Sequence, residues 1–229
     1  MPKLTGMKGI DKAAFAMAAV FLLAMPLSRG AGTKQSPASR PVVLVHGYMD
    51  DSSKMQWMAD AMRDQGFTVF TPSLTPSHGE VSQEELAKKL AAYIDAHIPH
   101  GEKFDLVAFS MGGVVCRYYL QRMGGMRRVD HFVTLGTPNH GTLLACLSQS
   151  PGCLELRPGS DFLNDLNSDA GTLSKVKYTS IWTPFDTIIV PSESSRMPVG
   201  QNIRIWVPIH PLLVWSPKSV RTVTGILRS

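Results

Sequence analysis

The sequence predicts an α/β fold with a mostly parallel sheet flanked by helices. Short, continuous apolar runs recur along the chain, as expected of strands that are buried on both faces. Segments with helical spacing of apolar residues fall between most of these runs. In addition, the strand candidate at residues 104–109 leads directly into a serine, two glycines and a helical segment. Together these features indicate repeated strand–helix units.

The expected elements follow in chain order. Residues 41–45 are a continuous apolar strand, residues 52–65 have helical spacing, and residues 67–70 form the next strand. Residues 82–98 begin with Ser-Gln-Glu-Glu, which is a capping-box pattern at a helix start. The later strands are expected at 104–109, 129–135, 176–182 and 203–207, and the later helices at 111–123, 142–149, 160–167 and 217–226.

The N-terminal region is typical of an export segment. Three lysines precede an apolar run at residues 13–25, which suits a signal peptide and is short of the ~20 residues that span a bilayer. We therefore expect a signal peptide at 1–31, a linker at 32–40 and a catalytic domain at 41–229, in a secreted or periplasmic protein. An uncleaved N-terminal anchor or a buried helix are the alternatives for residues 1–31, because no clean cleavage pattern follows the run.

The charge distribution argues against a nucleic-acid partner. Residues 1–31 contribute +3 of the net charge of +5, so the rest of the chain carries only +2 and shows no basic stripe. The hydrophobic content of 44% is that of a globular protein.

The three cysteines suggest one disulfide and one core thiol. Cys146 and Cys153 enclose a short segment with Pro151 and Gly152, which could turn the chain back, so a bond is expected in an oxidising compartment. Two unpaired thiols are the alternative. Cys116 lies on an expected helix and is interpreted as a small core residue.

The turn at residues 108–112 predicts a catalytic nucleophile. It reads Ala-Phe-Ser-Met-Gly, a variant of G-x-S-x-G, in which a tight turn raises the serine hydroxyl above the sheet. Alanine still meets the need for a small residue at the first position. The following helix directs its first amides towards the charge that develops in acyl transfer. Ser110 is therefore the predicted nucleophile; a serine that caps an ordinary helix is the alternative.

An activated serine needs a base, and in this arrangement the chain order is serine, acid, histidine. Four of the seven histidines precede Ser110, and His131 opens a strand at the wrong edge of a parallel sheet. His210 follows the last expected strand and is the predicted base. His140 precedes the candidate acid, so we interpret it as a wall or structural residue.

The acid is expected in the turn after residues 176–182. Asp186 lies there, between a strand and an apolar return, although an ordinary turn aspartate is the alternative. Asp161, Asp165 and Asp169 lie in a polar helical stretch and are interpreted as solvated.

Two backbone amides are expected to hold the oxyanion. One belongs to Met111, directly after the nucleophile, and the other to Tyr48, in the His-Gly turn after the first strand. His46 in that turn is interpreted as a residue that shapes the loop.

With these pieces in place, the chain resembles the bacterial lipase family of the α/β-hydrolase fold, especially small secreted triacylglycerol lipases with alanine in the serine turn. The matching segments are VVLVHGYM (42–49), DLVAFSMGGVVCRYYL (105–120), VTLGTPNHGT (133–142), LRPGSDFLNDLN (156–167), FDTIIVP (185–191) and the loop of His210. The resemblance implies a compact hydrolase with little or no lid and the same five site residues.

The expected function is a serine carboxylic-ester hydrolase, a lipase or esterase that acts through an acyl-enzyme in lipid degradation and needs no cofactor or metal. Its expected partners are a lipid or other acyl-ester substrate and a lipid–water interface. An acyltransferase, thioesterase or polyester depolymerase on the same fold is the first alternative, and a non-catalytic binding protein is the second. The candidates for the wall of the acyl pocket are Phe109, Leu143, Trp182 and Ile209, and for each of them a place in the hydrophobic core is the alternative.

Overall fold

The computed structural model describes residues 40–229, and within them six strands form one parallel sheet. The strand order is β2-β1-β3-β4-β5-β6, and every neighbouring pair runs parallel. The strands are β1 (Val42–Val45), β2 (Val69–Phe70), β3 (Phe104–Phe109), β4 (Val129–Leu135), β5 (Lys177–Trp182) and β6 (Gln201–Arg204). The predicted fold class is confirmed.

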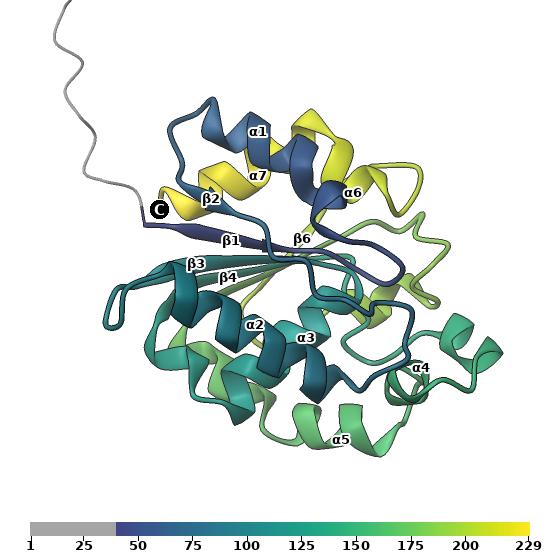
Figure 1. Ribbon diagram of the computed structural model, residues 1–229. Helices are drawn as coiled ribbons and strands as arrows, with labels where there is room; N and C mark the ends of the chain where they lie inside the picture. Colours follow the sequence, from purple (N-terminus) through teal and green to yellow (C-terminus); the bar gives the residue numbers. More distant parts are fainter. Residues whose placement is uncertain (1–39) are drawn as a thin grey trace, which may run out of the picture. The chain divides into compact units, whose positions relative to one another are not determined.

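Helices cover both faces of the sheet (Figure 1). One layer holds α1, α6 and α7, and the other holds α2, α3 and α5. The helices are α1 (Gln56–Arg63), α2 (Gln83–His97), α3 (Met111–Arg122), α4 (Pro151–Glu155), α5 (Asp161–Ser168), α6 (Leu212–Trp215) and α7 (Pro217–Leu227).

The core lies in two apolar layers, one on each side of the sheet. Successive side chains of a strand point to opposite faces, so β1 serves both layers. Val43 and Val45 belong to the cluster with α2 and α3, whereas Val42 and Leu44 belong to the cluster with α1 and α7. This two-sided burial explains the continuous apolar runs in the sequence.

The expected helix at 52–65 is a 3-10 turn followed by α1, and the expected strand at 67–70 shortens to β2, but two other elements differ more. The last strand was expected at 203–207 but pairs with β5 over Gln201–Arg204. Ile205 and Val207 are apolar because they are buried in the layer with α1 and α7. The expected helix at 142–149 is a short 3-10 helix, Leu143–Leu147, whose leucines are exposed. In that segment the apolar spacing does not mark a buried helix face.

The expected disulfide is wrong: all three cysteines, which lie within the described residues, are free thiols. Cys146 is exposed on the 3-10 helix, while Cys153 is buried in α4 beside the Tyr48 hydroxyl. The two side chains therefore occupy different environments. Cys116 lies in the core as expected, where burial raises the pKa of its thiol well above the ordinary value and leaves it unreactive.

The expected signal peptide and residues 32–39 of the expected linker lie outside the described residues. Between residues 40 and 229, no helix combines the length and the apolar composition that crossing a bilayer requires.

Candidate active site

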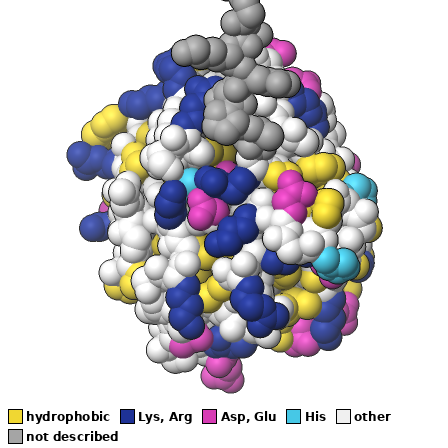
Figure 2. Space-filling model, turned by 90° about the vertical axis from the view of Figure 1, so that its left-hand side faces the viewer, with side chains coloured by type: hydrophobic (Ala, Val, Ile, Leu, Met, Phe, Trp, Pro, Cys, Tyr) yellow, Lys and Arg dark blue, Asp and Glu magenta, His cyan; other side chains and the backbone are white. Residues whose placement is uncertain are grey.

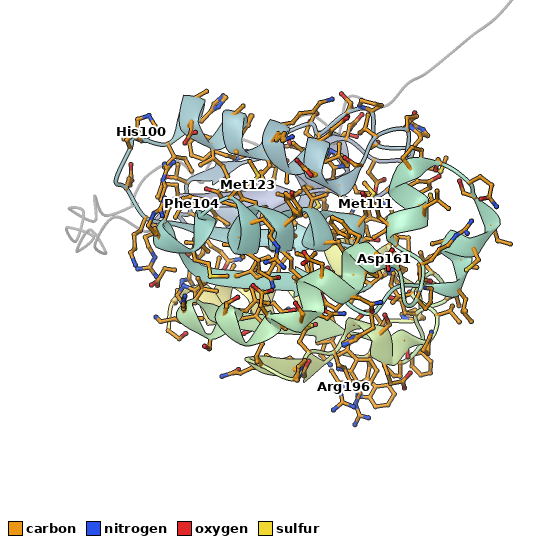
Figure 3. The ribbon with its side chains drawn as sticks, turned by 90° about the horizontal axis from the view of Figure 1, so that it is seen from below. His100, Phe104, Met111, Met123, Asp161 and Arg196 are labelled. Atoms are coloured by element: carbon orange, nitrogen blue, oxygen red, sulfur yellow. The ribbon has the colours of Figure 1, made fainter. Side chains whose placement is uncertain are left out.

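Ser110 lies at the carboxyl end of β3, at the turn into α3. Its backbone has φ of 54° and ψ of −129°, a conformation that non-glycine residues adopt rarely and at a cost. Its backbone amide still donates to Leu135 O at 2.9 Å, so the sheet holds one side of the turn. The amide of Met111 opens α3 and has no acceptor within the helix. Figure 3 shows Met111 at the end of α3 opposite to Met123.

Close backbone approach fixes this turn. A Cβ on Gly112 would lie 2.2 Å from the carbonyl oxygen of His46, and one on Gly113 would lie 1.9 Å from Thr137 Oγ1. Gly47, in the loop after β1, has room for only hydrogen beside Ser110, whose Cβ would lie 2.9 Å from an added methyl. These glycines bring the loop of Tyr48 against the serine turn.

We predict that Gly112→Ala lowers the free energy of unfolding by about 3 kcal/mol, because the added methyl overlaps a backbone carbonyl that cannot rotate away. Urea denaturation measures the change. Gly225→Ala is the matched control: its Cβ meets open space within α7, so it should stabilise the protein by about 0.5–1 kcal/mol. Equal stability of the two variants would contradict the close approach.

Asp186 and His210, which are 24 residues apart in the chain, meet at the same edge of the sheet. His210 Nδ1 lies 2.6 Å from Asp186 Oδ2, and both side chains are buried. The second carboxylate oxygen, Oδ1, accepts the amides of Ile188 and Ile189 at 3.0 and 2.9 Å. The carboxylate is thus held from one side and orients the imidazole with the other.

The remaining nitrogen of His210 is free to act. Nε2 is buried and has no hydrogen-bond partner among residues 40–229. The ring packs on Phe109, the residue before Ser110, with the ring centroids 4.7 Å apart. His210 also lies 2.9 Å, through Cε1, from where a Cβ on Gly136 would stand, so glycine is required there. His140, by contrast, is exposed and contacts Ser194 O.

His46 braces the loop that carries Tyr48. Its Nδ1 lies 3.0 Å from Gly47 O, and its Nε2 accepts the Leu74 amide at 2.8 Å. Burial lowers the pKa of His46, because the charged form would lose its water and the Leu74 amide would lose its acceptor. The sequence-based interpretation of His46 as a loop-shaping residue agrees with these contacts.

The lowered pKa of His46 predicts acid sensitivity. Its contribution to stability is complete above the unfolded pKa of about 6.5 and is lost as the pH falls below that value, because the unfolded chain then binds the proton more readily. In His46→Gln the amide oxygen can accept from Leu74 without titrating. The urea midpoint should therefore fall less between pH 7.5 and 5 in His46→Gln than in the unchanged protein. Parallel curves would refute the assignment.

The loop after β4 connects the serine turn to the loop of Asp186. The sequence analysis did not predict this connection. Thr137 Oγ1 donates to Ser110 O at 3.0 Å, and Thr142 Oγ1 donates to Ile188 O at 2.6 Å. Between them, Asn139 Nδ2 donates to Ser195 O at 2.7 Å. The loop therefore sets the spacing between the two halves of the site.

Arg117 anchors this loop from within the protein. It is fully buried, and desolvation lowers the pKa of its guanidinium to about 10. Its guanidinium donates to neutral oxygens: Asn139 O at 3.3 Å, Leu166 O at 2.9 Å and Asn167 Oδ1 at 2.9 Å. An arginine among the apolar residues of an expected helix was the signal that could have identified it.

Exposed apolar side chains are frequent on the loops at the carboxyl edge of the sheet. Most of the large ones lie on connections that follow the carboxyl ends of strands: Met49, Leu143, Leu144, Leu147, Phe185, Ile188, Trp206 and Ile209. Leu143, Leu144 and Leu147 are all exposed on one short helix, Leu147 by 85%, and a contiguous exposed apolar segment of this kind is typical of a surface that meets an apolar partner. Of the four expected wall residues, Leu143 and Ile209 are exposed at the rim, whereas Phe109 and Trp182 are buried.

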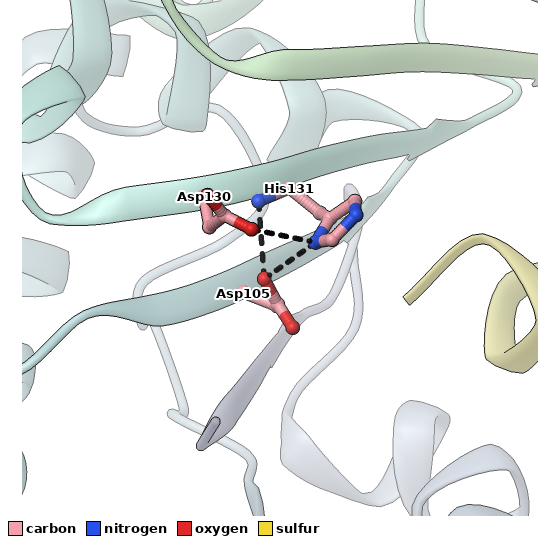
Figure 4. Close-up of side chains that lie close together, drawn as sticks. All are labelled: Asp105, Asp130 and His131. Atoms are coloured by element: carbon pink, nitrogen blue, oxygen red, sulfur yellow. Dashed lines mark hydrogen bonds and ion pairs between the residues drawn. The ribbon is translucent and has the colours of Figure 1, made fainter. Parts of the chain in front are cut away.

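The opposite edge of the sheet is charged instead. Figure 2 shows lysine and arginine side chains interspersed with acidic ones on that face. Asp105, Asp130 and His131 group there, and their ligand atoms lie within 4.8 Å of one another (Figure 4). Arg40 contacts both carboxylates, at 3.3 and 2.9 Å, and so supplies the positive charge that a metal ion would bring. We interpret the group as a structural link between the start of β1 and its neighbours.

The fold and the serine turn define the class of protein: it is an α/β-hydrolase. The Bacillus licheniformis lipase BlEst2 has a similar fold, with a TM-score of 0.70 at 20% identity over 84% of this chain and 93% of that one. Aspergillus fumigatus lipase B gives 0.73 at 19% identity over 90% and 56% of the two chains.

The chain belongs to the palmitoyl protein thioesterase family, whose model matches residues 41–184. The lysosomal thioesterase PPT2 of Mus musculus is 29% identical over 106 residues, which are 44% of this chain and 35% of that protein. The Homo sapiens protein of the same name is 28% identical over 126 residues. The chain thus spans little more than a third of the length of these relatives. The expected α/β-hydrolase fold is confirmed. The family shown is that of the palmitoyl protein thioesterases, and the expected membership of the triacylglycerol lipases is not confirmed.

Proposed function

We propose that this protein hydrolyses long-chain acyl thioesters and esters, with Ser110 as nucleophile, His210 as base and Asp186 as the orienting acid. The observation that carries the proposal is the buried Asp186–His210 pair, whose free Nε2 lies on the ring that packs beside the serine turn. In this proposal residues 41–229 are the catalytic domain. The protein acts after export, either secreted or in the periplasm.

The first half of the reaction forms an acyl-enzyme. His210 Nε2 takes the proton of the Ser110 hydroxyl as its oxygen attacks the acyl carbonyl carbon. The amides of Tyr48 and Met111 donate to the oxyanion, which is worth ~3–4 kcal/mol for each such donor. The bond to sulfur or oxygen then breaks, and His210 returns the proton to the departing thiol or alcohol.

The second half releases the acid. Water loses a proton to His210 Nε2 and attacks the acyl-enzyme carbonyl, the Ser110–acyl bond breaks, and His210 returns the proton to the Ser110 oxygen. Asp186 keeps the proton of Nδ1 in place throughout, so that Nε2 alone exchanges protons. Each of the five site residues predicted from the sequence thus has a defined step in this mechanism.

Thioester hydrolysis is favoured by the family, and ester hydrolysis by the apolar rim. Thiols leave more readily than alcohols, so one site can cleave both when the acyl group matches. The exposed leucines of the 3-10 helix Leu143–Leu147 support a substrate presented at a lipid–water interface.

The test compares a palmitoyl thioester with the oxygen ester of the same acyl group, below and above the concentration at which each forms aggregates. We expect kcat/KM to be higher for the thioester and the rate to rise on the aggregated substrate. A folded protein that cleaves neither substrate, and whose Ser110 is not labelled by a fluorophosphonate, would overturn the proposal.

A further inference from the structure

Exposed arginine and aromatic side chains, together with the buried Trp182 ring, lie next to one another at β6. We call this group the arginine–tryptophan face and define it by Phe185, Trp182, Arg196, Arg204 and Trp206. Trp182 of β5 and Arg204 of β6 are register partners, so their side chains leave the same side of the sheet. Arg204 lies 4.9 Å from the Trp206 ring, and Trp206 lies 5.5 Å from Phe185. Arg196, labelled in Figure 3, lies 5.8 Å from the Trp182 ring.

Both arginines of this face lack an acidic partner. Neither Arg196 nor Arg204 forms an ion pair with any carboxylate in residues 40–229, and both are exposed. By contrast, the partly buried Arg122 binds Asp165 and Asp169 at 2.8 and 2.9 Å, whereas the exposed Arg221 and Arg228 likewise have no ion pair within residues 40–229. On the arginine–tryptophan face the aromatic rings hold the guanidinium groups in place and leave their N–H donors open to an anion.

The backbone of β6 offers a second means of recognition. β6 is the last strand of the sheet, and Ile205 N donates inward to Trp182 O at 2.9 Å. Since backbone groups alternate along a strand, those of Arg204 point away from β5. An exposed strand edge of this kind pairs with an extended peptide, and alternate side chains then meet the neighbouring surface.

The face leads to the proposed catalytic groups. An open, shallow depression is lined by Pro184, Phe185, Asp186, Thr187 and Pro208. It extends from the exposed Phe185 ring to the loop of Asp186, the carboxylate that contacts His210. A molecule lying along β6 therefore has one end beside the site.

We propose that an extended, acidic polypeptide segment carrying the acylated cysteine docks on the arginine–tryptophan face, pairing with β6 while its carboxylates meet Arg196 and Arg204. This proposal rests on the proposed thioester hydrolysis. It specifies the leaving group, which is the cysteine thiol of an acidic polypeptide. The strand edge favours a peptide over a lipid surface, because a peptide backbone presents donors and acceptors at the spacing of the outward groups of β6.

The test uses three thioesters with the same acyl group: a peptide with Asp and Glu around the acylated cysteine, the same peptide with Lys, and a small thiol without peptide. In the variant Arg196→Glu/Arg204→Glu, KM for the acidic peptide should rise about tenfold or more, and KM for the lysine peptide should fall. The small thioester should keep its kcat/KM to within about twofold. Arg221→Glu on the exposed side of α7 is the matched control and should change none of the three.

Binding of the non-acylated acidic peptide, measured by fluorescence anisotropy, separates this proposal from the proposed function. We expect the unchanged protein to bind it and the double variant to bind about tenfold more weakly or not at all. Methylation of the peptide nitrogens that face β6 should weaken binding by a similar factor. Equal binding by both proteins would overturn the docking proposal even if hydrolysis persists. The docking proposal would also be overturned if the double variant binds the peptide normally and loses only the binding of anionic lipid vesicles, because that result identifies a membrane surface as the occupant. Failure to cleave the small thioester would instead count against the proposed function.

Discussion

Ser110→Ala should reduce the hydrolysis of a palmitoyl thioester by about 10⁶-fold in kcat, leaving only the rate that positioning and oxyanion donors provide. The alanine removes the oxygen that forms the acyl-enzyme, and no other hydroxyl belongs to the serine turn. The protein should remain folded, because the Ser110 side chain donates to no group within residues 40–229 and caps no amide of α3. Steady-state kinetics and urea denaturation of the same preparation give both answers.

Ser174→Ala is the matched control for this change. Ser174 is exposed and donates only to Gly171 O, so its removal should leave kcat within about twofold. A fluorophosphonate should label the unchanged protein and the Ser174 variant but not Ser110→Ala. A Ser110→Ala protein that keeps a tenth or more of the activity would end the assignment of Ser110 as nucleophile.

The sequence predicted the geometry around Ser110 well because the constraints there are local. A tight turn needs small residues at fixed offsets, and Gly112 is required by a carbonyl 2.2 Å from its missing Cβ. Chain order selected His210 and Asp186, and the structure places these two in contact. A parallel sheet brings the loops at its carboxyl edge together, so order along the chain carries spatial information. The catalytic roles of these residues remain predictions.

Features that depend on packing between distant segments were not predictable. Arg117 binds carbonyls of α5 and of the loop after β4, and no local pattern links these segments. The strand expected at 203–207 was misplaced because burial against a helical layer produces the same apolar alternation as a strand. The pairing of Cys146 with Cys153 failed because short separation does not fix the direction of a side chain.

Asp186→Asn should reduce kcat by about 10⁴-fold while preserving the fold. The two oxygens of Asp186 face different groups: Oδ1 accepts two backbone amides, and Oδ2 faces His210 Nδ1. The asparagine oxygen must replace Oδ1, since an amide NH₂ cannot accept from Ile188 and Ile189. Its NH₂ then donates to His210 Nδ1, and the imidazole proton moves to Nε2. A protonated Nε2 cannot take the proton of Ser110, so the base is lost although every side chain keeps its position.

The tautomer explanation predicts more than a loss of rate. Labelling of Ser110 by a fluorophosphonate should slow by a factor similar to that for kcat, because both need the same proton transfer, whereas the KM for the thioester should change by only about twofold. Asp161→Asn, at the exposed start of α5, is the matched control and should change neither rate. If Asp186→Asn stays within tenfold of the unchanged protein in both measurements, Asp186 holds the loop and does not set the tautomer of His210. The contact at 2.6 Å would then be structural, and His210 would need no carboxylate to act as a base.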